Sequence, residues 1–514
     1  MSRISAFAVA ALAALIVGCA SLPPLEGRTE TTALADTAGT RIGRALAPDV
    51  AANPGKTGIH PLPEGNAAFG ARVVFAAGAE KSIDAQYYIW HGDQAGYLLF
   101  EALWQAAERG VRVRLLLDDL NTGGLDPTIA ALDAHPNIEV RLYNPLVQRG
   151  ARMLNFLTDF ERVNRRMHNK SFTVDNQVSI VGGRNIANEY FGVGSGVVYA
   201  DLDVIAVGAA VREVSKEFDL YWNSPSAYPA ASFVGAPGPD GVADLEARFA
   251  ATRADPESVA FIEAGRTTSV VRDLLGGRLA LEWTHAQAVY DDPAKTLDTT
   301  DRTDVLLFPE LVRTIGRPEK TFDLVSPYFV PGEGGTAALV ARASEGVKVR
   351  ILTNSLASTH ASVVHAGYAK RREDLLRAGV QLYEIKTTAA REARDDKVKY
   401  GSSSSAALHA KTFAVDRSRI FVGSFNFDQR SARLNTEMGL VIDSPKFAQV
   451  LAERFDTTAP MIAYEVRFGP DGRSLEWIER TASGETRYDT EPGTSWFQRR
   501  SVDVLSILPI DWML

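Results

Sequence analysis

The chain has 514 residues, of which 46% are hydrophobic and 23% are charged, and these values are ordinary for a soluble globular protein. A chain of this length is sufficient for about two to four domains, each with its own core. The formal net charge of −8 argues against a general nucleic-acid binder, because such proteins are usually basic.

The N-terminus has the pattern of a secretory signal peptide. Residues 4–18 form an unbroken apolar run after Arg3, and this run is too short to span a bilayer as a helix. It ends in Ile16-Val17-Gly18-Cys19, which resembles the lipobox of bacterial lipoproteins. In that family the cysteine carries a diacylglyceryl group and becomes the first residue of the mature chain. The alternative is a plain secretory signal followed by an incidental cysteine.

We therefore expect a signal peptide over residues 1–18 and a lipid anchor on Cys19, which is the single cysteine of the chain. With no second thiol, no internal disulfide can form. The resemblance implies a membrane-anchored lipoprotein of the cell envelope that faces the periplasm. Ala20 stands after the cysteine in place of Asp, which favours the outer membrane over the inner membrane.

Residues 19–70 are rich in Ala, Gly, Thr and Pro and are expected to form a tether. Beyond the tether, short β-rich runs alternate with helical patterns in both halves. They are KSIDAQYYIW (81–90), GYLLFEALWQAAERG (96–110) and VRVRLLLDD (111–119), then KTFDLVSPYFV (320–330), TAALVARASEG (336–346) and VKVRILTNS (347–355). This alternation predicts parallel strands joined by crossovers, hence an α/β fold. We expect two domains related by an approximate twofold axis, over residues 71–225 and 319–514. Residues 226–318 have no counterpart in the first half and are expected to form a connecting segment with added helix.

One pattern of nineteen residues occurs twice, as MHNKSFTVDNQVSIVGGRN (167–185) and LHAKTFAVDRSRIFVGSFN (408–426). Both copies contain His-x-Lys, four residues, an Asp, six residues and Gly-x-x-Asn. Five fixed residues match a random position roughly once in three million, so the repeat is not a coincidence.

Strand alternation places each His and Lys on one face, together with apolar residues. Asp175 and Asp416 are expected to shape the turn that follows and to pair locally. The glycines after the second strand would let the backbone approach a ligand closely, and Asn185 and Asn426 can donate hydrogen bonds to it.

Two histidines, two lysines and two asparagines suit a phosphodiester. The ammonium and amide groups can bind its anionic oxygens, one imidazole can attack phosphorus, and the other can protonate the leaving oxygen. Zinc is disfavoured because a protonated lysine is no ligand and no other cysteine is available, so we expect no metal and no cofactor. A Ser-His-Asp hydrolase is disfavoured because no nucleophile-elbow pattern accompanies either histidine.

The duplicated pattern resembles the HKD motif of the phospholipase D superfamily, whose two motifs meet at one active site at the domain interface. GGRNIANEYF in the first half and GSFNFDQRSARLNTE in the second are similar to bacterial cardiolipin synthases. DAQYYIW, GVRVRLLLDD and TDFERVNRRMHNK, with the signal sequence, most resemble the cardiolipin synthase C type. The resemblance covers residues 75–514, and it implies two phospholipase D-like domains.

The resemblance implies a role for each site residue. His168 would be the nucleophile that forms a phosphohistidine, and His409 would protonate the leaving alcohol and then act as a base. Glu437 would orient the imidazole of His409, and Asp201 is assigned to His168. The phosphate would be bound by Lys170, Lys411, Asn185 and Asn426. Ser424 could add a hydroxyl contact on the second side only, because the first motif has Gly183 at this position.

Three neighbouring features have less specific patterns. Arg162, Arg165 and Arg166 could steer an anionic head group or form a solvated helix face. Tyr87, Tyr88 and Trp90 are expected in the core or in the pocket wall. The serine run 402–405 is expected to form a loop at the pocket mouth.

Three functions remain open at this point. The first is a phosphatidyl transferase that makes cardiolipin, with phosphatidylglycerol or phosphatidylethanolamine as the donor and with a helper protein as a further partner. The second is a hydrolase of the same superfamily, either a phospholipase D or a phosphodiesterase. The third is a non-catalytic envelope-binding lipoprotein, which the intact His, Lys and Asn residues disfavour. The acidic balance and the anchor argue against nucleic acid as a partner.

Overall fold

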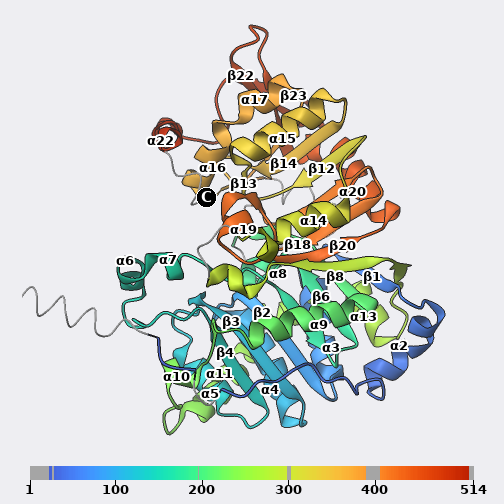
Figure 1. Cartoon of the computed structure of the whole chain (residues 1–514), viewed down its shortest axis with the longest axis vertical. Helices are drawn as coiled ribbons and strands as arrows, with labels where there is room; N and C mark the ends of the chain where they lie inside the picture. Colours follow the sequence, from blue (N-terminus) through green and yellow to red (C-terminus); the bar gives the residue numbers. More distant parts are fainter. Residues whose placement is uncertain are drawn as a thin grey trace, which may run out of the picture.

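The structure is a computed structural model that describes residues 22–25, 28–194, 196–297, 302–359, 361–388 and 406–508. Cys19 and the serine run 402–405 lie outside the described residues. Figure 1 shows two α/β units stacked along the long axis of the molecule, the first drawn in blue to green and the second in yellow to red. No helix within the described ranges is both long enough and apolar enough to cross a membrane.

Each unit is built on one large mixed sheet. In the described part of the chain, the first sheet has nine strands in the order β10 (Glu282–Thr284), β1 (Thr57–Leu62), β8 (Asp203–Gly208), β6 (Val178–Gly182), β5 (Ser171–Val174), β2 (Ser82–Ile89), β3 (Arg112–Asn121), β4 (Ile138–Tyr143) and β9 (Ala227–Pro229). The second has ten, in the order β11 (Ala286–Tyr290), β20 (Met438–Ile442), β18 (Arg419–Gly423), β17 (Thr412–Val415), β12 (Thr321–Val325), β14 (Lys348–Asn354), β15 (Gln381–Ile385), β21 (Ala463–Phe468), β22 (Leu475–Thr481) and β23 (Gly484–Tyr488).

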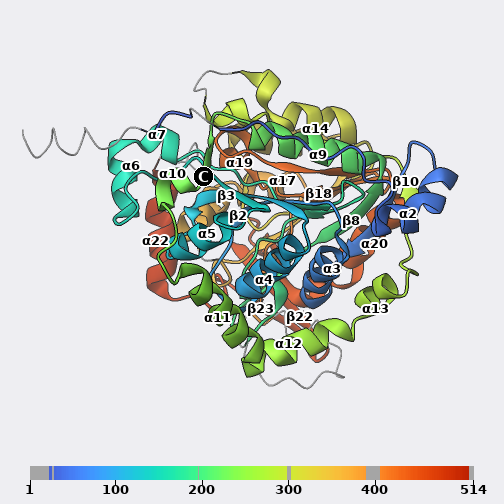
Figure 2. The same ribbon diagram turned by 90° about the horizontal axis from the view of Figure 1, so that it is seen from below.

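Helices cover both faces of each sheet. Figure 2 shows α9 on one face of the first sheet and α3 and α4 on the other. The helices before residue 226 are α2 (Arg41–Ala52), α3 (Gly65–Gly78), α4 (Gln94–Glu108), α5 (Asp126–Asp133), η1 (Arg152–Leu154), α6 (Asn155–Thr158), α7 (Phe160–Val163), α8 (Asn188–Phe191) and α9 (Ala209–Trp222). Those of the connecting segment are α10 (Ala231–Val234), α11 (Gly241–Ala254), α12 (Pro256–Arg266), α13 (Ser269–Leu275), η2 (Pro293–Thr296), η3 (Thr303–Val305) and α14 (Leu307–Ile315). The second unit contains α15 (Gly332–Ser344), α16 (Ser362–Ala369), α17 (Arg372–Arg377), α19 (Gln429–Arg433), α20 (Pro445–Thr457), α21 (Ala459–Ile462) and α22 (Trp496–Ile507).

The two halves repeat the same interactions as well as the same elements. β2, β3 and β4 are parallel, as are β12, β14 and β15, which confirms the predicted crossovers. Arg114 on β3 makes a buried bidentate ion pair with Asp84 on β2, at 2.7 and 2.9 Å. Arg350 on β14 makes the same pair with Asp323 on β12, at 2.6 and 2.8 Å. The repeated GVRVR and GVKVR segments therefore encode a repeated structural ion pair.

The predicted tether is wrong for residues 41–52, 57–62 and 65–70. These residues form α2, β1 and the start of α3, and β1 is an internal strand of the first sheet, between β8 and β10. The composition did not indicate an internal strand, because Pro61 cannot donate a ladder hydrogen bond and proline is normally absent from such strands. The strand tolerates Pro61 because β10 pairs only with Thr57, Gly58 and Ile59.

The connecting segment carries strands as well as the predicted helices. β10 pairs with β1 of the first sheet, and β11, which follows after a single residue, pairs with β20 of the second. Beside this crossing lies a buried apolar cluster with side chains from both units, including Val181 and Val204 from the first and Ile420 and Leu440 from the second. The two units therefore share a hydrophobic interface, and the repeated motifs lie at its edge.

Candidate active site

The two motifs meet because each one pairs with backbone from the other half. The His168 N–H donates to the carbonyl of Thr436, and the Thr436 N–H donates to the carbonyl of Arg166. On the other side, β16 (Ala406–Leu408) pairs in parallel with β7 (Val198–Ala200), and the N–H of His409 donates to the carbonyl of Ala200. Each histidine is thus placed beside the residue that precedes a carboxylate of the opposite half.

The predicted partners of the two carboxylates are wrong. His168 Nδ1 lies 2.8 Å from Oε2 of Glu437, and His409 Nδ1 lies 2.6 Å from Oδ2 of Asp201. The expectation from the resemblance pairs Glu437 with His409 and Asp201 with His168. The cross-pairing follows from the backbone contacts, because Glu437 comes directly after Thr436 and Asp201 directly after Ala200.

A carboxylate on Nδ1 fixes the tautomer of each ring and leaves Nε2 available for chemistry. Glu437 is held by the hydroxyls of Ser431, at 2.7 Å, and Ser424, at 2.5 Å. Its backbone N–H donates to Asp291, which was not identified from the sequence. Burial raises the pKa of Glu437 to about 7. Burial would raise the pKa of Asp201 as well, but its contact with His409 and the charge of Lys411 hold it below its usual value.

Both imidazoles are neutral in this arrangement. Burial, reinforced by the positive charges of Lys170 and Lys411, holds the pKa of His168 well below 6.5. Burial and Lys411 lower the pKa of His409 to about 3. Burial also lowers the pKa of Lys170 to about 7 and that of Lys411 to about 8. A bound anion would raise all four values, because it stabilises the protonated forms.

The lysines occupy equivalent positions, just before β5 and β17 rather than within these strands. Lys170 Nζ donates to the carbonyl of His168, and Lys411 Nζ donates to that of His409, each at 2.5 Å. Lys411 Nζ also lies 3.0 Å from Nε2 of His409. Lys411 therefore flanks the ring of His409, and Lys170 is held against the backbone of His168.

Comparison with known proteins agrees with this geometry. The family model described as "Cardiolipin synthase, PLD-like domain" matches residues 75–222 and 311–459, which cover both motifs. The chain belongs to the phospholipase D superfamily. The prediction of two phospholipase D-like domains is therefore confirmed.

The relatives match nearly the whole length of this chain. Cardiolipin synthase C of Escherichia coli (strain K12) is 44% identical over 474 residues, which cover 92% of this chain and 100% of that protein. An uncharacterized protein of Helicobacter pylori (strain ATCC 700392 / 26695) is 30% identical over 483 residues, which cover 91% of this chain and 92% of that protein. The crystal structure of phosphatidylserine synthase from Haemophilus influenzae Rd KW20 has a TM-score of 0.50 and 14% identity, and covers 83% of this chain and 92% of that chain. At that identity the likeness shows the fold alone.

The two asparagines of the phospholipase D motifs differ in their surroundings. Asn185 accepts from the N–H of Ile89 and donates to the Tyr190 hydroxyl, at 3.1 and 2.9 Å. Asn426 is 5% exposed, and its Oδ1 has no hydrogen-bond partner among the described residues. The Nδ2 group of Asn185, which would be the donor to a phosphate, is already engaged by the Tyr190 hydroxyl.

Two expectations are wrong, one for Ser424 and one for the glycines near the end of each motif. The Ser424 hydroxyl is fully buried and donates to Glu437, so it supports the carboxylate and does not face a phosphate. The glycines make room for protein and not for a ligand. A Cβ on Gly183 would lie 2.2 Å from Oδ1 of Asp201, and one on Gly423 would lie 2.4 Å from the carbonyl of Met438.

The motif aspartates act at the opposite end of their strands. Asp175 has φ 51° and accepts from the N–H groups of Glu80, Lys81 and Ser82. Asp416 has φ 52° and accepts from Glu319, Lys320 and Thr321. As predicted, both residues shape their turns, but they bind the start of the neighbouring strand and not a local partner.

Aromatic rings line the site. Tyr88 packs edge-on against His168 with 5.0 Å between ring centroids, so it lies in the pocket wall, whereas Tyr87 and Trp90 are in the core. Tyr199 stacks on His409 at 5.2 Å, and Tyr190 meets it edge-on at 4.9 Å. Tyr190 and Tyr199 were not identified from the sequence because neither belongs to the repeated pattern.

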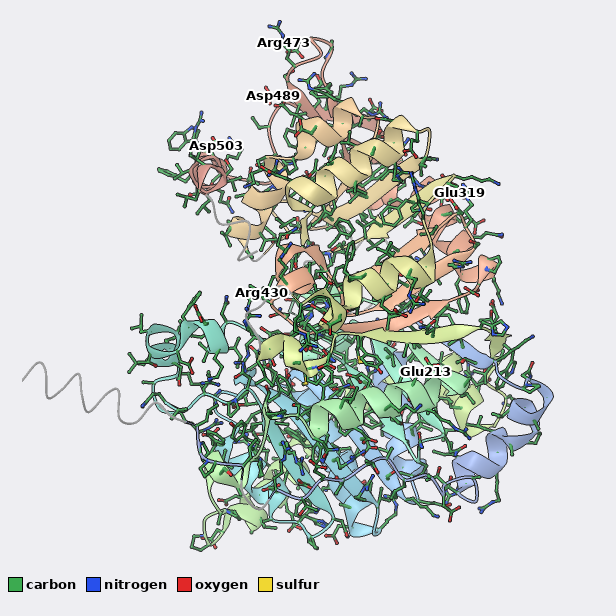
Figure 3. The ribbon with its side chains drawn as sticks, in the orientation of Figure 1. Glu213, Glu319, Arg430, Arg473, Asp489 and Asp503 are labelled. Atoms are coloured by element: carbon green, nitrogen blue, oxygen red, sulfur yellow. The ribbon has the colours of Figure 1, made fainter. Side chains whose placement is uncertain are left out.

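The arginines before the first motif are structural. Arg166 is fully buried and forms an ion pair with Asp118 at 2.7 Å, so it cannot steer a head group. Arg162 pairs with Asp159, and Arg165 donates to the carbonyl of Lys295. Arg430 donates to Asn164 across the junction of the two domains, where Figure 3 labels it.

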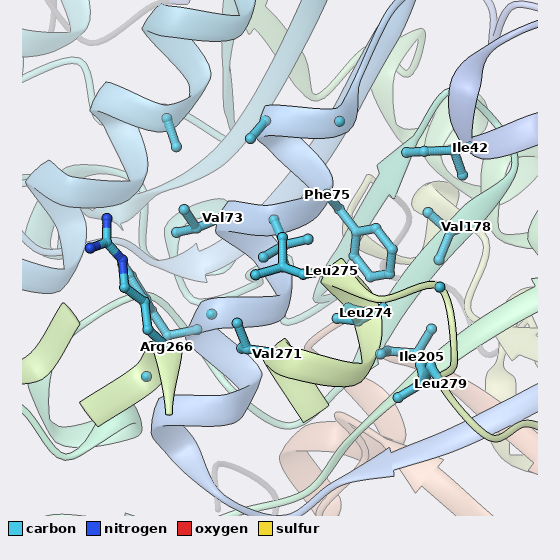
Figure 4. A pocket seen from close by; sticks show the side chains of 18 of the residues that line it. Ile42, Val73, Phe75, Val178, Ile205, Arg266, Val271, Leu274, Leu275 and Leu279 are labelled. Carbon is cyan, nitrogen blue, oxygen red and sulfur yellow. The ribbon is translucent and has the colours of Figure 1, made fainter. Parts of the chain in front are cut away.

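Two other features are separate from the site. His91, Asp93 and Glu189 could together hold a metal ion, but neither motif histidine belongs to this cluster, and Asp93 already caps α4 and α8. A cavity of about 790 Å³ lies among α2, α3, α4, α12 and α13. It is lined mainly by apolar side chains such as Val73, Phe75 and Leu274 (Figure 4), and none of its lining residues is a His, Lys or Asn of the repeated motifs.

Proposed function

We propose that the protein is a phosphatidyl transferase that makes cardiolipin through a covalent phosphohistidine. The observation that carries this proposal is the pair of buried imidazoles, each oriented by a carboxylate of the opposite half and flanked by a lysine. The relation to cardiolipin synthase C of E. coli over 92% of this chain supports the choice of reaction.

His168 is the nucleophile in this proposal. Its carboxylate partner, Glu437, has a pKa of about 7 and is a weak counter-charge, so the imidazole stays neutral and can attack. The partner of His409 is Asp201, which is ionised and favours an imidazolium once a phosphodiester has bound. His409 is therefore the better general acid.

The first step forms a bond between Nε2 of His168 and phosphorus and breaks the bond to the head-group oxygen. His409 gives its proton to that oxygen, and the free alcohol leaves. Lys170, Lys411 and Asn426 bind the phosphate oxygens, whose charge grows in the transition state. The donor is phosphatidylglycerol or phosphatidylethanolamine, so the leaving alcohol is glycerol or ethanolamine.

The second step transfers the phosphatidyl group to phosphatidylglycerol. His409, now neutral, removes the proton from a hydroxyl of the acceptor, which attacks phosphorus and releases His168. The side chain of His168 is 8% exposed and that of His409 is 13% exposed, so water has limited access to the intermediate. Water can attack the phosphohistidine with the help of the same groups, so we expect some phosphatidic acid as a side product.

We further propose that Cys19 anchors the protein to the envelope, facing the periplasm, with the outer membrane preferred. A helper protein could assist. The two ammonium groups neutralise the phosphate, so the proposed reaction needs no divalent cation.

The test is lipid mass spectrometry after incubation of the full-length protein with vesicles of phosphatidylglycerol, alone or with isotope-labelled phosphatidylethanolamine. Cardiolipin should form in both, with chelator present, and His168→Ala should form none. Labelled cardiolipin would identify phosphatidylethanolamine as the donor. Phosphatidic acid as the sole product would favour the hydrolase, and loss of activity with chelator would overturn the metal-free mechanism.

A further inference from the structure

The segment that leads into the first motif exposes a row of large apolar side chains. Met153 is 75% exposed, Leu154 48%, Leu157 81% and Phe160 41%. Met153, Leu154 and Leu157 follow one another through η1 and α6 at helical spacing, so they share one face. Phe160 begins α7, after the non-helical residue Asp159.

Helix α22 exposes a second row. Trp496 is 56% exposed, Phe497 76%, Val504 63% and Ile507 82%. The opposite face of the helix already has a packing partner, because Val502 and Leu505 contact Leu356 and Ala366. One apolar face of α22 packs against the second domain, and the other apolar face is exposed.

Both rows lie close to the active site. The first row ends eight residues before His168 and follows β4, at the carboxyl end of the parallel strands, where ligands bind in α/β sheets. α22 packs on α16, which follows β14. Asn354, the last residue of β14, binds the backbone of Leu408 just before His409.

The elements that carry the two rows lie on the same side of the molecule. In both Figure 1 and Figure 2, α6, α7 and α22 lie along the left side. Figure 3 shows α22 at the edge of the second domain, with Asp503 labelled on it. α10 lies on the same side, and Arg28 binds the carbonyls of Asn223, Ser224 and Ala227, which come just before α10 in the chain. Arg28 therefore lies on this side as well.

We propose that the two rows form a membrane-docking face, consisting of Met153, Leu154, Leu157 and Phe160 from the first domain and Trp496, Phe497, Val504 and Ile507 from the second. The partner is a phospholipid surface. Apolar side chains enter the boundary between head groups and acyl chains, and Trp496 sits at that boundary. The identity of the lipid in this proposal rests on the proposed function. Docking through this face would place the opening of the active site against the membrane.

The docking test uses the full-length, anchored protein. Cys19 is the only native cysteine and its sulfur carries the diacylglyceryl group in the proposed anchor, so an introduced cysteine can be labelled alone. An environment-sensitive dye is attached to Leu157→Cys, Phe497→Cys or the control Leu275→Cys, where Leu275 is 68% exposed on α13. In phosphatidylglycerol vesicles, the dye emission should shift to the blue at positions 157 and 497 and not at 275. No shift at 157 and 497, or an equal shift at all three positions, overturns the docking face.

A second measurement separates docking from catalysis. Leu157→Glu combined with Phe497→Glu should lower turnover of vesicle phosphatidylglycerol at least tenfold. Turnover of a short-chain phosphatidylglycerol dissolved as monomers should be unchanged, because these residues do not touch the site. Leu275→Glu should affect neither. Equal turnover of vesicle lipid by wild type and the double variant would contradict docking, whereas failure of the wild type on both substrates would contradict only the proposed function.

Discussion

Nδ1 of His168 lies 2.8 Å from Oε2 of Glu437, although 269 residues separate them in the chain. Asp201 and His409 make the reciprocal contact at 2.6 Å. Each carboxylate therefore serves the histidine of the other half, and this arrangement leads to separable tests of the two histidine roles.

The first prediction concerns the two carboxylates. Glu437→Gln should slow formation of the phosphohistidine, and Asp201→Asn should slow departure of the alcohol, each by about 100- to 10,000-fold. A phosphatidyl ester of p-nitrophenol needs little proton donation. Asp201→Asn should therefore recover most of its activity on this ester, and Glu437→Gln should not. If Glu437→Gln recovered its activity instead, His409 would be the nucleophile and His168 the general acid.

The second prediction concerns the histidines themselves. His168→Ala should abolish the covalent intermediate, because no other group replaces its Nε2. His409→Ala should still accumulate phosphohistidine from the p-nitrophenyl ester, but should release it slowly. Rapid quenching and mass spectrometry of peptides would locate the phosphoryl group. A phosphohistidine at position 409 would reverse the assignment.

The third prediction is a pH dependence. The pKa of Lys170 is about 7 and that of Lys411 about 8, so kcat/KM should fall as the pH rises through this range and the site loses positive charge. The lysine pKa values are lower in the folded state than the usual 10.5. The unfolded chain therefore binds more protons above pH 7, and this contribution to stability rises with pH.

Activity and thermal stability should thus change in opposite directions between pH 7 and 9, and both are measured on the same samples. In Lys170→Met, the rise in stability over this range should be smaller than in the wild type. A wild-type kcat/KM that stays flat to pH 9 would show that the lysine charges do not limit the reaction.

The fourth prediction separates structural from chemical parts of the motif. Asp175→Ala removes the acceptor for three backbone N–H groups and should lower the free energy of unfolding by about 1 to 3 kcal/mol. Asp416→Ala should do the same in the second half. Urea denaturation measures the loss, and kcat per folded molecule should stay within about twofold. A large loss of kcat at full stability would make these aspartates catalytic.

The fifth prediction concerns the anchor. Cys19→Ser should leave the protein without lipid, because no other thiol exists in the chain. Metabolic labelling with a radioactive fatty acid gives the answer, and Ala20→Ser provides a matched control that should remain labelled. Persistent label on the Cys19→Ser protein would show that the lipobox interpretation is incorrect.

The sequence predicted the parts of the molecule that are repeated. His168, Lys170 and Asn185 were found because their counterparts recur at the same spacing, and the shared active site followed from the superfamily resemblance. The partner of each carboxylate could not be found in this way. It depends on which backbone segments pair across the interface, and no local pattern encodes that pairing. The strand that contains Pro61 was missed because its stability comes from two neighbours that are distant in the chain.

The crossing of the two halves also affects the protein during its synthesis. His168 is made before Glu437, and His409 enters the fold only when Ala200 is in place to receive it. Neither imidazole is oriented until both halves have docked. The chain is therefore inactive until both domains are complete, and a half-synthesised protein cannot act on lipids.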